Sequence, residues 1–114
     1  TLADRYGFMS GKSTHADRVQ TIRDCSEKNG VLIDPHTADG VKVARDVRNQ
    51  VDTPIVCLET ALLVKFAETI NEAIGKDPEI PSRFAEIMDA DRFVVDMPND
   101  AEAVKKYIAE NATE

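Results

Sequence analysis

The feature that most constrains this chain is a repeated order in which a segment with helical periodicity is followed by a short, mostly apolar run. Three such runs occur, at residues 31–33, 55–58 and 92–95, and each is bordered by a proline: Pro35, Pro54 and Pro98. Proline disfavours helical geometry in the residue before it, and apolar runs of this length between breakers are typical of buried strands. The pattern therefore predicts three short strands.

Apolar residues at helical spacing predict a helix on each side of these strands. Ser13 or Thr14 can cap the first helix, which should end at Asn29-Gly30. The others are expected from Thr37 to about Val51, from about Ala61 to Gly75, and after a cap at Asn99 or Asp100, with a short helical piece at 83–88. Alternating helices and strands predict an α/β fold, with a small, mainly parallel three-stranded sheet and flanking helices.

Length and charge limit the classes of protein to consider. A chain of 114 residues can bury one modest core, so we expect a single α/β domain over residues 1–114. The net charge of −7 argues against binding of nucleic acid, whose phosphates would be repelled. The sequence has no apolar run near the roughly 20 residues that span a bilayer and no signal-peptide core at its start, which predicts a cytoplasmic protein. Cys25 and Cys57 are expected to be buried thiols.

Residues 10–14, which read SGKST, suggest a phosphate-binding loop of nucleotide hydrolases at first sight. That motif requires a glycine five positions before the Gly-Lys pair, where this chain has Tyr6, and no buried strand precedes it. Lys12 is also a weak candidate for a Schiff-base lysine, since no apolar residues flank it to lower its pKa. We expect neither a nucleotide site nor a catalytic lysine here.

Metal ligands are not indicated, because His15, His36, Cys25 and Cys57 lack ligand-type spacing. Two other segments are better candidates for a site. Residues 34–38 and 59–61 place polar side chains directly after a predicted strand and before a predicted helix, where open α/β sheets bind ligands. Thr37 or Thr60 could equally be a plain helix cap.

The two segments carry a family resemblance. Residues 30–40 read GVLIDPHTADG and residues 58–66 read LETALLVKF, and both are similar to stretches near the end of threonine synthases. Residues 10–19 and 97–100 also resemble the family. One departure is Leu62-Leu63, where members often have His-Pro or Leu-Pro, so the geometry after Thr60 can differ.

The resemblance implies part of a fold-type-II enzyme that uses pyridoxal phosphate to convert O-phospho-L-homoserine to L-threonine and phosphate. It places Thr60 near the pyridine nitrogen of the cofactor and Asp34 and His36 in the loop beside the substrate. Lys65 could face a substrate phosphate, although an exposed helix lysine is an equal alternative. The Schiff-base lysine and the loop for the cofactor phosphate are expected in the remainder of the enzyme chain, so this portion alone should be inactive.

Two further readings remain open from the residues alone. A free-standing α/β binding or receiver-like module would fit the alternation, but it should have an acidic cluster after its first strand, and Asp34 alone does not supply one. A purely structural or interaction domain would have its motif-bearing edge covered by another chain.

Overall fold

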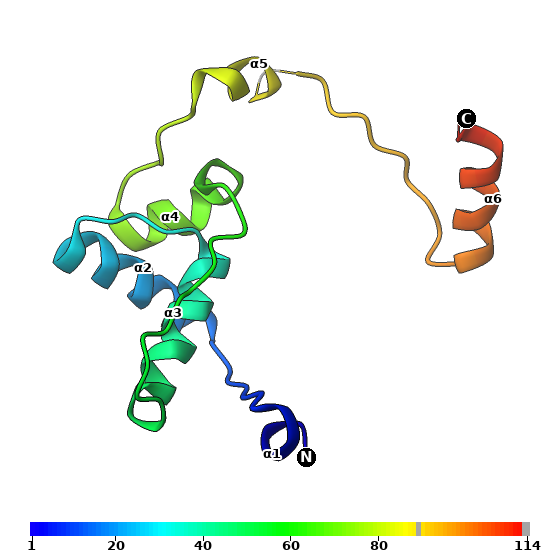
Figure 1. The fold of residues 1–114 in the computed structure, drawn as a ribbon. Helices are drawn as coiled ribbons and strands as arrows, with labels where there is room; N and C mark the ends of the chain where they lie inside the picture. Colours follow the sequence, from blue (N-terminus) through cyan, green and yellow to red (C-terminus); the bar gives the residue numbers. More distant parts are fainter. Residues whose placement is uncertain (89, 113–114) are drawn as a thin grey trace. The chain divides into compact units, whose positions relative to one another are not determined.

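The first long helix begins and ends where the sequence indicates. The computed structural model describes residues 1–88 and 90–112, and α2 runs over His15–Asn29 (Figure 1). Thr14 is its N-cap: the Thr14 hydroxyl accepts from the Asp17 amide at 3.2 Å, and the Asp17 carboxylate accepts from the Thr14 amide at 2.9 Å. Gly30 ends the helix in the left-handed region at φ 67°, which glycine adopts without steric cost. Both predicted boundaries are confirmed.

The second predicted helix is also confirmed, whereas the third begins later than expected. Helix α3 covers Pro35–Val47 and continues as the 3-10 turn η1, Arg48–Gln50. The chain then runs back beside α3 without regular structure (Figure 1). A 3-10 helix, η2, covers Leu63–Phe66, and α4 covers Ala67–Ile74 before Gly75. Residues 60 and 61, predicted to start a helix, lie in irregular chain.

The core lies where α2 packs against α3 and α4. Ile22 of α2, Ala38 of α3 and Ile70 of α4 are fully buried. The remaining buried apolar residues of the core are Val19, Cys25, Ile33 and Ala73. Three helical stripes at 3.6-residue spacing therefore meet in one small hydrophobic core.

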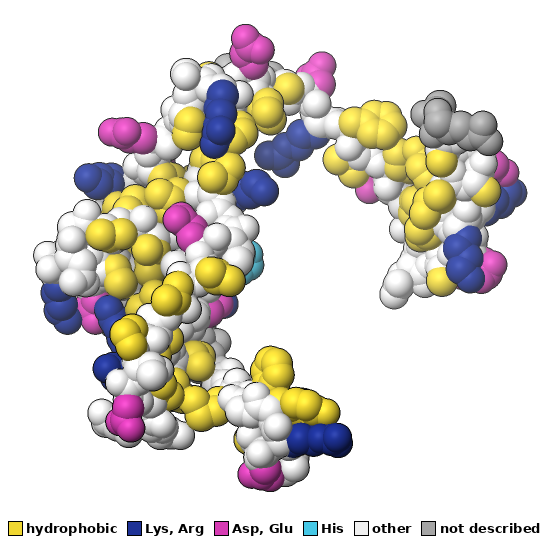
Figure 2. All heavy atoms as spheres, in the orientation of Figure 1, with side chains coloured by type: hydrophobic (Ala, Val, Ile, Leu, Met, Phe, Trp, Pro, Cys, Tyr) yellow, Lys and Arg dark blue, Asp and Glu magenta, His cyan; other side chains and the backbone are white. Residues whose placement is uncertain are grey.

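The chain divides into two compact units, Thr1–Pro81 and Ser82–Glu114. The first unit also contains α1, Leu2–Tyr6, which sequence reasoning missed within a polar lead-in. The second unit contains η3, Ser82–Phe84, then α5, Ala85–Met88, and α6, Ala101–Asn111. Asp100 caps α6, as predicted. Figure 2 shows hydrophobic side chains at the surface of α1 and α6. Leu2 of α1 and Ile108 of α6 are 67% and 56% exposed.

The predicted three-stranded sheet is wrong. Within residues 1–88 and 90–112 the chain contains helices, turns and irregular segments, and none of the three apolar runs is a strand. Val56 and Leu58 are 79% and 77% exposed, and Phe93 in the second unit is 88% exposed. An apolar run becomes a strand only when a neighbouring strand satisfies its N–H and C=O groups, and periodicity along one segment does not supply that neighbour. A receiver-like module, which is built around such a sheet, loses its support for the same reason.

Two composition-based expectations can be compared with the structure. Both cysteines are free thiols; Cys25 is buried as predicted, but Cys57 is only half-buried. In the part of the chain that the structure describes, no helix combines the length and apolarity needed to cross a bilayer.

Candidate functional site

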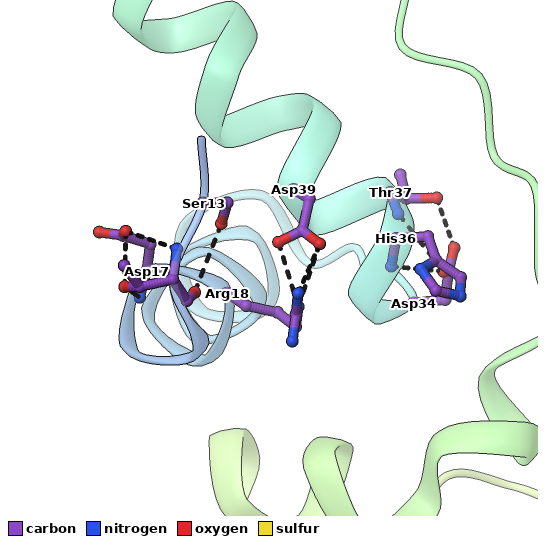
Figure 3. A network of polar contacts seen from close by, with 8 residues as sticks. Ser13, Asp17, Arg18, Asp34, His36, Thr37 and Asp39 are labelled. Atoms are coloured by element: carbon purple, nitrogen blue, oxygen red, sulfur yellow. Dashed lines mark hydrogen bonds and ion pairs between the residues drawn. The ribbon is translucent and has the colours of Figure 1, made fainter. Parts of the chain in front are cut away.

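The first turn of α3 is organised by a buried carboxylate. Asp34 is fully buried and is the N-cap of α3. Its side chain accepts hydrogen bonds from the amides of His36 at 2.8 Å and Thr37 at 3.3 Å, and from the Thr37 hydroxyl (Figure 3). A carboxylate at this position satisfies free amides and interacts favourably with the helix dipole. The cap is thus Asp34 and not Thr37, which supports Asp34 from the third helical position.

The local sequence explains this geometry. Pro35 occupies the first helical position, where its missing N–H costs no hydrogen bond and its fixed φ suits a helix. Asp34 before it is extended, with φ −72° and ψ 162°, as a residue before proline prefers. Ile33 is buried in the core and anchors the chain just before α3 begins. The Asp-Pro-His-Thr order therefore fixes where α3 starts and where residue 36 lies.

One turn further along α3, Asp39 pairs with Arg18 of α2. The Arg18 Nε lies 3.1 and 3.2 Å from the two Asp39 carboxylate oxygens, and its Nη2 donates to one of them at 2.7 Å. Figure 3 shows the two side chains pointing toward each other from the two helices. Both are less than one third exposed, so the pair is partly shielded from water. This fork-shaped contact fixes the first turns of α2 and α3 relative to each other.

The charges of the pair are mutually stabilised. Burial raises the pKa of the Asp39 carboxyl, but the hydrogen bonds from Arg18, the nearby Ser13 hydroxyl and the charges of Arg18 and His36 together lower it more. The pKa of Asp39 therefore lies below its usual value of 3.8. The hydrogen bond to Asp39 likewise raises the pKa of the Arg18 guanidinium. Both groups stay charged at neutral pH.

His36 connects the two sequence motifs. Its side chain is exposed, and its ring meets the ring of Phe66 in η2 edge to face, with centroids 5.0 Å apart and an interplanar angle of 84°. Phe66 is the last residue of the LETALLVKF segment. Lys65, the residue before it, is exposed in η2. The structure thus brings the residue 34–38 segment next to the end of the residue 58–66 segment.

Thr60 lies apart from these contacts. It is exposed and lines a shallow cavity of about 380 Å³ together with Glu59, Ala61 and Leu62. Its hydroxyl can donate one hydrogen bond and accept others. Glu59 lines the same cavity, so its polar lining comprises a carboxylate as well as this hydroxyl. The residues that line it include no lysine, so the covalent attachment of a cofactor would have to come from elsewhere.

Sequence reasoning missed Arg18, Asp39, Ser13 and Phe66 as members of this region. Asp39 could have been found, because it lies three residues after His36 and therefore on the same face of a predicted helix. The partnership with Arg18 depends on how α2 crosses α3, which no local pattern reveals. No group of three or more potential metal ligands occurs among the described residues.

Comparisons with known proteins show which family has these motifs. The sequence model of the family "Threonine synthase, C-terminal" matches residues 37–108. A threonine synthase of Corynebacterium glutamicum is 64% identical over 95% of this chain and 22% of its own length. A threonine synthase of Methylobacillus glycogenes is 45% identical over 93% of this chain and 22% of its own length. The chain spans about a fifth of the length of these relatives.

A solved structure gives the same assignment. The crystal structure of pyridoxal-phosphate-bound threonine synthase from Brucella melitensis matches 96% of this chain and 26% of its own, with a TM-score of 0.67 and 28% identity. The family match extends over more than half of the 114 residues and includes both the end of the Asp-Pro-His-Thr turn and the Lys65-Phe66 segment. This chain belongs to the threonine synthase family, in the part that the family model describes as C-terminal.

Proposed function

We propose that residues 1–114 form a carboxy-terminal portion of a cytoplasmic, pyridoxal-phosphate-dependent enzyme that converts O-phospho-L-homoserine to L-threonine and phosphate. The observation that carries the proposal is the contact between His36 and Phe66, which joins the two family motifs in space. The remainder of the same enzyme chain is its main partner. Free thiols at Cys25 and Cys57 are compatible with a reducing compartment.

Thr60 is the proposed neighbour of the cofactor's pyridine nitrogen. When bound, pyridoxal phosphate supplies an electron sink for changes at the carbon atoms of an amino acid. The Thr60 hydroxyl is neutral, so it would not stabilise a protonated ring nitrogen as a carboxylate would. This weaker stabilisation favours elimination and replacement over transamination. The exposed position of Thr60 in its cavity leaves the hydroxyl free to approach a ligand.

Asp34, His36 and Lys65 would serve the substrate side in different ways. Asp34 is fully buried and already accepts hydrogen bonds from α3, so its role would be to position His36. His36 and Lys65 are exposed and carry the donors that a phosphate monoester requires. Lys65 would add a positive charge close to the leaving phosphate.

The test uses the full-length enzyme with Thr60→Val and Thr60→Ser, assayed for phosphate release from O-phospho-L-homoserine. Thr60→Ser keeps the hydroxyl and should retain kcat within a few-fold, whereas Thr60→Val should lower kcat by about tenfold or more, roughly 1.4 kcal/mol of barrier. Equal kcat values for Thr60→Val and the unchanged enzyme would exclude the role of Thr60.

A second set of variants tests the proposed substrate roles of His36 and Lys65. His36→Asn and Lys65→Gln should raise KM for O-phospho-L-homoserine by about tenfold, which corresponds to the loss of one charge-assisted hydrogen bond. Lys76→Gln is the control, because Lys76 is an exposed lysine just after α4 and outside the motif. An unchanged KM for Lys65→Gln would assign Lys65 to the solvated surface.

The isolated 114-residue chain should neither bind the cofactor tightly nor release phosphate. Mixing it with pyridoxal phosphate should leave the visible spectrum that of free cofactor. A new absorption band of lysine-linked cofactor, or turnover by the isolated chain, would overturn this part of the proposal.

A further inference from the structure

The ring of His36 projects from a turn whose other side chains are buried. Of residues 33–38, His36 is exposed and the remaining five are buried. The His36 amide donates to the Asp34 carboxylate at 2.8 Å, and Asp34 itself is fully buried (Figure 3). The backbone of residue 36 is thus held in place, and rotation about its side-chain bonds is the freedom that remains.

Phe66 restricts that rotation from the side of η2. Its ring meets the His36 ring edge to face, with the centroids 5.0 Å apart. Phe66 is half-buried, and two neighbours along the chain fix its position: Leu63 packs against the hydrophobic core, and Ile70 is fully buried. A ring anchored by the core therefore meets a ring mounted on a fixed turn, which limits the rotamers that His36 can adopt.

Asp39 is a second candidate for a residue that orients the His36 ring, because it lies one helical turn further along α3. Its carboxylate is engaged elsewhere, since Arg18 holds it through contacts of 2.7, 3.1 and 3.2 Å. The guanidinium neutralises the charge that would otherwise attract the imidazole. We therefore assign the orientation of His36 to its contact with Phe66.

Building on the proposed function, we propose that Phe66 is a positioning residue for phosphate binding: it holds the His36 imidazole in the orientation that donates to the substrate phosphate, without touching the substrate itself. A free side chain loses rotational freedom when it binds a ligand, and this loss weakens binding. With Phe66 in place, the loss has already occurred in the folded enzyme. The effect belongs to binding of the phosphate group, so it should appear in KM and leave kcat unchanged.

The direct test is a titration of the full-length enzyme with inorganic phosphate, followed by NMR of ¹³C-labelled histidine. His36→Asn identifies the His36 signal by removing it. Phosphate should shift that signal, and Phe66→Leu should raise the half-saturating phosphate concentration by about three- to tenfold, the range of one aromatic pair contact. Phe66→Tyr keeps the ring and should stay within about twofold of the unchanged enzyme.

Steady-state kinetics with O-phospho-L-homoserine separates positioning from general packing. Phe66→Leu should raise KM by about three- to tenfold, with kcat within about twofold of the unchanged enzyme. The inhibition constant of inorganic phosphate should rise equally, while that of L-threonine, which lacks the phosphate, should stay constant. In a His36→Asn background, Phe66→Leu should raise KM no further, because its effect passes through His36.

Two controls separate these effects from a general loss of folding. Phe8→Leu makes the same substitution at an exposed ring of the lead-in and should leave KM unchanged. If Phe66→Leu does not fold, Phe66→Met fills a similar volume without a ring and takes its place in both experiments.

A His36 signal that does not respond to phosphate would overturn the inference, because His36 would then not be a phosphate ligand. Equal phosphate affinity with and without the Phe66 ring would reduce Phe66 to a packing residue, as would KM effects that multiply in the double variant. The phosphate titration requires no turnover. An enzyme that is inactive on O-phospho-L-homoserine, but whose His36 signal responds to phosphate and depends on Phe66, would reject the proposed function and leave this inference intact.

Discussion

The imidazole of His36 meets the phenyl ring of Phe66 edge to face, with the ring centroids 5.0 Å apart. His36 belongs to the first turn of α3 and Phe66 ends η2, so the contact holds together two segments that are separated by an irregular stretch of chain. Edge-to-face geometry places the positive ring edge against the negative ring face. The contact therefore fixes the direction of the exposed His36 side chain.

Removal of this contact should have a measurable energy. In a double-mutant cycle of His36→Leu and Phe66→Leu, we expect a coupling of about 0.5–1.5 kcal/mol in the free energy of urea unfolding. His15→Leu combined with Phe66→Leu is the matched control, because His15 is an exposed histidine that pairs with Glu72, whereas the Phe66 ring contacts His36. A coupling near zero for the first cycle would show that the two rings are neighbours without a specific interaction.

The Arg18–Asp39 pair should make the stability depend on pH. The folded pKa of Asp39 is lowered, so its contribution is present above the unfolded pKa, near 3.8, and is lost as the pH falls through the folded pKa. Asp39→Asn should therefore destabilise the chain at pH 7 by about 1 kcal/mol and lose that difference in strong acid. Urea unfolding between pH 7 and pH 2 measures both limits.

The control for this prediction is Glu102→Gln on α6. Glu102 pairs with Lys105, but both side chains are more than 70% exposed, so the pair should contribute almost nothing. If neither Asp39→Asn nor Glu102→Gln changed the free energy of unfolding at any pH, the Arg18–Asp39 contact would have no special energetic role.

Substitution of the Asp34 cap should lower the stability of the first unit more than most single substitutions. Asp34→Ala removes three hydrogen bonds around the first turn of α3 and leaves the buried Thr37 hydroxyl without its acceptor. We expect a loss of about 2 kcal/mol, while Asp34→Asn, which keeps one carbonyl acceptor, should lose less. Asp100→Ala removes the cap of α6 instead and should reduce local helicity without changing the unfolding of the first unit. Equal losses for Asp34→Ala and Asp100→Ala would refute a special role for the buried cap.

The helix ends were predictable because their signals are local. Thr14 and Asp100 as caps, and Gly30 and Gly75 as stops, follow from chemistry within four residues, and the structure confirms each of them. The sheet was not predictable in the same way. Residues 55–58 have strand-like composition, but pairing depends on a second segment that must lie alongside.

The residues of the candidate site also fall into those that the sequence indicates and those that depend on tertiary packing. Asp34, His36 and Thr60 were singled out by their position after predicted strands and by the family motifs. The strands are wrong, so the motifs alone support these residues, and their roles stay predictions. Arg18 and Asp39 lie within family-like stretches, but nothing in the sequence singles them out, since each resembles any charged residue of a solvated helix face. Only the crossing of α2 over α3 makes them partners, and that crossing is set by the burial of Ile22 and Ala38.

A close approach between the lead-in and α3 gives a last prediction. A Cβ placed on Gly11 would lie 2.8 and 3.0 Å from the two terminal carbons of Val43, closer than real Cβ contacts allow. Valine has a stiff side chain, so it cannot easily turn away. Gly11→Ala should therefore cost about 1–2 kcal/mol of stability by overpacking.

The steric origin can be separated from any effect of alanine itself. Gly40→Ala is the matched control, because a Cβ there meets nothing within 4 Å and Gly40 lies inside α3, where alanine should stabilise the helix by about 0.5–1 kcal/mol. Combining Gly11→Ala with Val43→Ala removes the two clashing carbons, so the double variant should be more stable than the sum of the single effects predicts. Strict additivity, measured by urea unfolding of the four proteins in the cycle, would rule out the clash as the cause. Because Val43 also lines the open apolar cavity between α3 and residues 55–58, a positive coupling would show that the lead-in around Gly11 packs against one wall of that cavity.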